Sequence, residues 1–167
     1  MSDALERLCA DQSKRLGAAL TRLVDAKAAD ELVSGLVQRR AAVWVESLGD
    51  MPIGFADLRA QAADAHGRGL PLVVENSLAT SFGCPACRLG ADVVVEFLTR
   101  AWPEGTGRCV ALSASKACPS DLRVALAALP SAVFDDTAVT SLVAALAAFP
   151  ARRRREDDAA QVVAAYL

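Results

Sequence analysis

The sequence predicts an α/β fold, a three-layer sandwich with a parallel sheet between two layers of helices, followed by a helical C-terminal segment. Three observations lead to this prediction. Short apolar runs rich in valine alternate with segments of helical period, the pattern of parallel strands joined by crossover helices. The runs are continuous, as expected of strands buried on both faces. Beyond Cys118 the runs stop, and helical periodicity continues to the end.

Strands and helices are expected to alternate over the first two thirds of the chain. Helices are predicted where leucine, valine and alanine recur every three or four residues, at 3–20, 29–38 and 55–66. Strands are predicted at the apolar runs, 20–24, 41–45, 70–74, 92–97 and 108–112. Gly49, Pro52 and Gly54 predict a loop before the third helix. Gly67 and Gly69 suit the C-terminal end of that helix.

Three further helices are predicted in the tail, at 121–129, 137–149 and 152–166. Pro130 and Pro150 are expected to separate them, because proline lacks the N–H that a helix interior requires. Asp135 or Asp136 suits the N-cap of the middle helix. We therefore expect one domain over 1–167, with an α/β part at 1–115 and a helical tail at 116–167.

Composition excludes several classes of protein. Hydrophobic residues make up 53% of the 167 residues and charged residues 23%, which indicates a packed core rather than disorder. A net charge of −2 and 5% aromatic residues predict no nucleic-acid partner. The longest charge-free apolar stretch, 137–151, is too short to span a bilayer, and the N-terminus resembles no signal peptide. A cytoplasmic location with five reduced cysteines is expected, because an odd number cannot form a closed disulfide framework.

Three consecutive segments carry a more specific signal: VWVESLGDMPIGFADLRAQAADAHGRG, LPLVVENSLATSFGCPACRLGADVVVEFLTR and AWPEGTGRCVALSAS. In this order and spacing they resemble the pyridoxal-phosphate enzymes of cysteine and methionine metabolism, which include cystathionine gamma-synthase, cystathionine lyases and methionine gamma-lyase. The family pattern runs approximately V-W-V-E-S-P-S-N-P, a helix ending A-H-x-x-G, V-V-D-N-T-F-A-T-P and G-A-D-I-V-V-H-S-A-T-K. The resemblance is most specific over 41–100 and weaker over 20–40.

The resemblance implies part of the fold-type-I large domain, here as a truncated central portion, and it implies pyridoxal-phosphate chemistry. In the family a lysine forms the Schiff base, and a carboxylate pairs with the pyridine nitrogen. Hydroxyls before the lysine bind the phosphate, and an asparagine contacts the substrate. The corresponding positions here are Arg100 for the lysine, Glu75 for the carboxylate, Phe97 and Thr99 for the hydroxyls, and Asp50 for the asparagine.

Most of these positions depart from the pattern. Arg100 stays protonated and supplies no free amine. Glu75 reaches one methylene further than aspartate, Phe97 has no hydroxyl, and Glu96 puts a negative charge where the family has histidine. The family's phosphate loop and stacking tyrosine lie upstream and have no counterpart. We therefore expect a cystathionine gamma-synthase-like protein that has lost pyridoxal-phosphate catalysis, with no cofactor and a non-catalytic, interaction or remnant role.

Two enzymatic alternatives remain open. The first is a pyridoxal-phosphate-dependent carbon–sulfur lyase or transsulfuration enzyme that works with a partner chain. Lys116 ends an S-A-S-K segment similar to the S-A-T-K signature, but without the G-A-D lead-in a loop lysine is favoured. The second alternative is a redox protein, because Cys84 and Cys87 form a C-x-x-C. Half a zinc site has the same spacing, but its second half is missing, so no metal site is predicted.

The remaining charged features favour structural roles. His66 is the single histidine, at the end of a predicted surface helix. Residues 152–155 are four arginines followed by three acidic residues, which predicts ion pairs along a solvated helix. The family's large domain has more strands than this chain supplies, so a sheet edge is expected to lie open. A homo-oligomer or a complementary chain is the expected cover.

Overall fold

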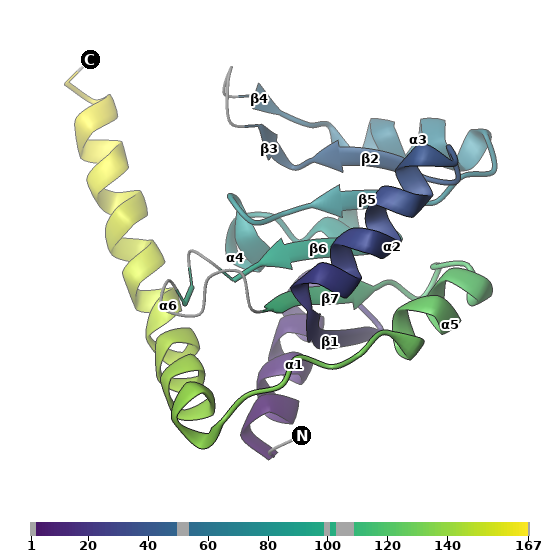
Figure 1. Ribbon diagram of the computed structural model, residues 1–167. Coiled ribbons are helices and arrows are strands. Elements are labelled where there is room, and N and C mark those ends of the chain that lie inside the picture. Colours follow the sequence, from purple (N-terminus) through teal and green to yellow (C-terminus); the bar gives the residue numbers. More distant parts are fainter. Residues whose placement is uncertain (1–2, 50–53, 99–100, 103–108, 167) are drawn as a thin grey trace.

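The computed structural model describes residues 3–49, 54–98, 101–102 and 109–166. A five-stranded sheet in the order β1-β7-β6-β5-β2 lies between two layers of helices (Figure 1). Its strands are β1 Leu20–Asp25, β2 Val43–Glu46, β5 Leu72–Glu75, β6 Val93–Phe97 and β7 Cys109–Ala114. The α/β prediction is confirmed, and every expected strand is present within two or three residues of its predicted bounds.

The sheet is mixed rather than wholly parallel. Strands β2, β5 and β6 are parallel neighbours, as predicted. Strand β7 runs antiparallel to both β6 and β1. Only residues 98–108 separate β6 from β7, and a parallel pair needs a crossover of about a dozen residues or more, usually with a helix. The short connection therefore reverses β7.

Helices cover both faces of the sheet. They are α1 Asp3–Leu16, α2 Ala26–Gln38, α3 Leu58–Gly67, α4 Thr80–Gly83, α5 Ser120–Ala128, α6 Asp136–Ala164 and the 3₁₀ helix η1 Ala86–Leu89. Helices α2 and α5 pack on one face, and α1, α3, η1 and α6 pack on the other. The expected loop at 49–54 is bounded by two short paired strands, β3 Leu48–Gly49 and β4 Gly54–Phe55.

The core follows from the alternation of side chains along β6. Val93 and Val95 pack with residues of α2 and α5, whereas Val94 packs with residues of α3. All three valines are at most 2% exposed. Two helix layers thus explain why the valine run is continuous.

The tail differs from its prediction at Pro150. Instead of two helices, α6 continues through this proline for 29 residues. Proline removes one backbone hydrogen bond, but the flanking turns are held by side chains. Phe149 packs edge-on against Phe82, with ring centroids 5.2 Å apart. Arg152 pairs with Glu156 at 3.6 Å and Arg153 with Asp157 at 3.4 Å, as the charge pattern predicted. Asp135 caps the helix by accepting from the Ala138 amide at 2.7 Å.

A buried carboxylate attaches α3 to the sheet. Asp92, at the start of β6, is 3% exposed. Its Oδ2 atom accepts a hydrogen bond from the Leu72 amide at 2.8 Å and lies 2.7 Å from His66 Nε2. His66 is thus a structural residue, as predicted, and its partner is the aspartate of the G-A-D segment.

We predict that Asp92→Ala lowers the free energy of unfolding by about 1–3 kcal/mol, because it leaves the buried Leu72 amide without an acceptor. The matched control is Asp64→Ala. It removes an exposed carboxylate that pairs with Arg68 at 3.1 Å on α3, and it should cost less than about 0.5 kcal/mol. Urea unfolding followed by circular dichroism measures both. Equal losses from the two variants would contradict the assigned role of Asp92.

Candidate functional site

Polar side chains gather where the three parallel strands end. Glu46 ends β2, Glu75 ends β5 and Glu96 lies one residue before the end of β6. Glu46 and Glu75 are register partners, and so are Glu75 and Val95. Because ligands of open α/β sheets bind at the carboxyl ends of the strands, this edge is the candidate site.

A buried amide organises the chain after β5. The Asn76 side chain is fully buried. Its Oδ1 accepts from Ser47 Oγ at 2.7 Å, and its Nδ2 donates to the Cys84 carbonyl at 3.1 Å. Its backbone amide donates to the Val95 carbonyl at 2.8 Å. These bonds tie the ends of β2, β5 and β6 to the segment that carries the C-x-x-C.

One oxygen of the Glu75 carboxylate is held by its own loop. Its Oε1 atom accepts hydrogen bonds from the Ser77 amide at 3.0 Å and from the Ser77 hydroxyl. The same hydroxyl accepts from the Phe97 amide at 2.7 Å. Burial raises the pKa of Glu75, and the neighbouring Glu46 carboxylate raises it further. The Ser77 hydrogen bonds partly offset this upward shift of the pKa.

Glu96 points to the opposite face of the sheet, because it follows Val95 in the alternation. It is 4% exposed. Its Oε2 atom accepts from Gln12 Nε2 of α1 at 2.7 Å and from the Ser81 amide of α4 at 3.2 Å. Burial raises the pKa of Glu96 to about 7. Glu75 and Glu96 therefore lie on opposite faces of the sheet, so they do not form one catalytic pair.

The anion-binding end of α2 is also occupied. Helix α2 begins at the carboxyl end of β1, where its first amides would favour a phosphate. Asp25 caps this end, and its Oδ1 accepts from the Ala28 amide at 3.0 Å. An apolar groove runs between α2 and the sheet, lined by Ala29, Asp30, Val33, Ser34, Val37, Gln38, Trp44, Val95 and Phe97. No basic side chain is among these lining residues.

The structure separates the residues that the sequence singled out. Thr99, Arg100 and Asp50 lie outside the described residues. Lys116 is exposed in the turn after β7. The Ser115 amide before it bonds to the Asp92 carbonyl, so Lys116 lies at the opposite end of β6 from Phe97.

Cys84 and Cys87 are half-buried and pack on the α3 side of the sheet. Burial raises the pKa of Cys84, and it raises the pKa of Cys87 to about 12. A reactive thiol requires the opposite shift. Within the described ranges, no group of three or more histidine, cysteine or acidic side chains is arranged to hold a metal ion.

Sequence reasoning missed the partners of the buried carboxylates. Gln12 and Ser81 reach Glu96 from separate elements, and no local pattern marks them. Asp25 had a usable signal, because aspartate before a helix is a common N-cap. The predicted helix began at 29, three residues after the observed start at Ala26, so the cap was overlooked. Of the helices in the described part of the chain, none is both long and apolar enough to cross a membrane.

Comparison with known proteins extends the resemblance along the chain. Cystathionine gamma-lyase of Dictyostelium discoideum is 31% identical over 87 residues, which cover 52% of this chain and 22% of that protein. Homocysteine/cysteine synthase of Kluyveromyces lactis is 33% identical over 95 residues, covering 56% and 21%. This chain thus aligns with about a fifth of each of these relatives.

Two solved structures share the fold. An apo methionine gamma lyase from Micromonospora echinospora superposes with a TM-score of 0.69 at 19% identity, covering 89% of this chain and 53% of that one. Cystathionine gamma synthase from Xanthomonas oryzae pv. oryzae gives 0.68 at 14% identity, covering 90% and 52%. The family model for Cys/Met metabolism PLP-dependent enzymes matches residues 3–167. With nearly its whole length matched and its fold shared, the chain belongs to this family of pyridoxal-phosphate-dependent enzymes.

Proposed function

We propose that this chain is a non-catalytic, cystathionine gamma-synthase-like module that acts through self-association. The observation that carries the proposal is that none of the lysines lies where it could form the Schiff base. The sequence has three lysines, Lys14, Lys27 and Lys116, and the family position is Arg100. Lys116 follows the far end of β7, and Lys14 lies in the last turn of α1, which leads to the amino end of β1.

Lys27 alone lies near the carboxyl edge of the sheet, in the first turn of α2. Its side chain is 87% exposed, and it pairs with Glu31 at 3.9 Å. A Schiff-base lysine works as a nucleophile when burial or a neighbouring cation lowers its pKa. Neither condition holds for a lysine that faces water beside a carboxylate.

The described residues do not fit pyridoxal phosphate. The carboxyl that would pair with the pyridine nitrogen is Glu75, and Ser77 holds it in its own loop through one oxygen. The phosphate needs amides or cations, whereas Asp25 caps α2 and the groove lining contains one charged residue, Asp30. These features support loss of the cofactor, and the redox alternative is disfavoured by the raised pKa values of both C-x-x-C thiols.

The sheet edges support self-association. The outer edge of β1 is covered, because the Asp25 amide bonds to the Pro130 carbonyl and the Ala132 amide to the Leu23 carbonyl. Strand β2 ends the sheet on the other side, and its first three residues are half-buried. An exposed edge strand is a template for pairing. Antiparallel pairing of two β2 strands about a two-fold axis would place Val45 opposite Val45 and Trp44 opposite Glu46, and would keep the two Glu46 carboxylates apart.

We predict that purified protein titrated with pyridoxal phosphate develops no defined absorbance band of an internal Schiff base. Borohydride reduction and peptide mapping should find only weak labelling, spread over Lys14, Lys27 and Lys116. The reason is that Arg100 cannot supply an amine, and no lysine is placed to replace it.

Single substitutions identify the lysine responsible if an absorbance band does develop. Lys27→Arg and Lys116→Arg each remove one lysine while keeping the charge. Arg100→Lys restores the family residue and tests the amine alone; because the capped end of α2 and the groove lining offer no phosphate site, it should also give no defined band. A stoichiometric band that one of the lysine variants abolishes would overturn the proposal and restore the enzymatic alternative.

We predict that Cys84 and Cys87 react with iodoacetamide at least about tenfold more slowly in the folded protein than in guanidinium at pH 7.5, because burial disfavours their thiolates. Mass spectrometry of each peptide over time measures the two rates, with glutathione as the reference thiol. A faster reaction at either cysteine in the folded state would support redox chemistry.

We predict a dimer at tens of micromolar in sedimentation velocity. The Val43 and Ser47 amides bond inward to β5, so the Trp44 and Glu46 amides face the open edge. Glu46→Pro removes one outward N–H and should shift the population toward monomer. Glu46→Ala, which keeps that N–H, should remain dimeric. A monomeric wild-type protein would contradict this part of the proposal.

A further inference from the structure

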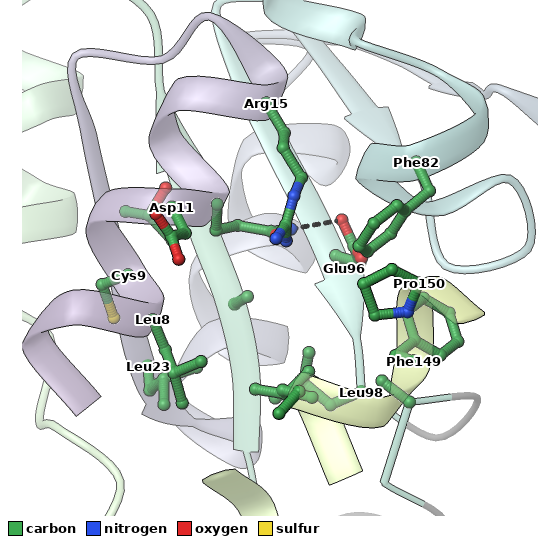
Figure 2. Close-up of a pocket in the computed structure, with 16 residues that line it drawn as sticks. Leu8, Cys9, Asp11, Arg15, Leu23, Phe82, Glu96, Leu98, Phe149 and Pro150 are labelled. Carbon is green, nitrogen blue, oxygen red and sulfur yellow. Dashed lines mark hydrogen bonds between the residues drawn. The ribbon is translucent and has the colours of Figure 1, made fainter. Parts of the chain in front are cut away.

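A cavity lies on the other face of the sheet, between α1 and α6 (Figure 2). Its volume is about 190 Å³. Strands β1, β6 and β7 form the floor, and Phe82 of α4 closes one end. Asp11 and Ala147, which line it, are exposed, so the cavity reaches solvent between the two helices. Neither the groove beside α2 nor the family comparison accounts for it.

Most of the wall is apolar. Figure 2 shows Leu8 and Leu23 on one side and Leu98, Phe149 and Pro150 on the other. A cavity of about 150 Å³ with such a lining holds benzene in another protein. The space therefore fits one six-membered ring with a short substituent.

One buried carboxyl group supplies a polar end. Glu96 lines the cavity, and both of its hydrogen bonds to described residues end on a single oxygen, Oε2. None of the ion pairs formed within the described part of the chain includes Glu96. A carboxylate buried without a cation is costly, and a ligand cation would remove that cost.

The nearest basic side chain is already engaged. The Arg15 guanidinium lies 4.3 Å from the centre of the Phe82 ring, where a cation–π contact holds it. Asp11 adds a second acidic group at the rim, and the Glu75 carboxyl is close enough to raise the pKa of Glu96. With two acidic groups and one base in the lining, the cavity favours a cation over an anion.

We propose that this cavity binds a small primary amine with a compact apolar body, its ammonium group on Glu96 and its ring against Leu8, Leu23 and Leu98. The ligand class follows from the two ends of the space, an apolar wall of ring size and a buried carboxyl group with an oxygen available. Binding requires no cofactor and does not depend on the loss of catalysis.

Benzylamine is the probe, with benzyl alcohol and benzoate as neutral and anionic controls of the same shape. Isothermal titration and ligand-observed NMR at pH 8 should show benzylamine binding at least about tenfold more tightly than benzyl alcohol, because a charged hydrogen bond in a buried site contributes at least that factor. Benzoate should not bind detectably. Equal affinities for the three compounds would overturn the proposal.

Two matched variants locate the contact. Glu96→Gln keeps an acceptor for the Ser81 amide, and it should weaken benzylamine by about tenfold or more while leaving benzyl alcohol unchanged. Asp11→Asn removes the rim carboxylate and should have little effect. A loss confined to Asp11→Asn would overturn the assignment to Glu96. Leu146→Trp, which fills the cavity, should abolish binding of both compounds, with circular dichroism as the check on folding.

The pH dependence gives an independent readout. The ionised form of Glu96 must bind the ammonium group, and its pKa is about 7. Benzylamine affinity should therefore be about tenfold lower at pH 6 than at pH 8 in the wild type, and flat in Glu96→Gln. Other titratable or charged groups facing this region are Cys9, Asp11 and Arg15 on α1, Glu75 on β5 and Arg152 on α6. An unchanged pH profile in Glu96→Gln would contradict the proposal.

Discussion

The burial of β6 on both faces and along both edges is the constraint on which the rest of the structure depends. Val93, Val94 and Val95 are almost fully buried, and β5 and β7 flank the strand. Each face then requires a helix layer, which α2 and α5 provide on one side and α1, α3 and α6 on the other. The same burial places a carboxylate out of water near each end of the strand.

These two carboxylates differ in how the fold satisfies them. Asp92 lies at the amino end, where the Leu72 amide and His66 meet one of its oxygens. Glu96 lies at the carboxyl end, where Gln12 and Ser81 provide hydrogen bonds but burial still raises its pKa to about 7. Asp92 therefore stabilises the fold by joining α3, β5 and β6. Glu96 has the raised pKa and the oxygen on which the proposed binding of an amine rests.

Membership of the family depends on other residues than the chemistry at the carboxyl edge of the sheet does. The fold depends on apolar residues at alternating positions, and these are kept. Cofactor binding depends on a few side chains at the strand ends, and the proposed loss of the cofactor rests on these. Glu75 is held by Ser77, Asp25 occupies the end of α2, and the adjacent groove is apolar. A fold can persist after its site changes, because packing tolerates substitutions that catalysis does not.

The sequence by itself determined the α/β class, the five strands and the family. Valine runs, glycines and contiguous motifs are local signals, so one sequence suffices to detect them. Only the tertiary structure decided the reversal of β7, the continuation of α6 through Pro150 and the separation of Lys116 from Phe97. It also brought Gln12 and Ser81 to Glu96 across 84 and 15 residues of sequence. Such contacts arise from packing between distant segments, which local periodicity does not encode.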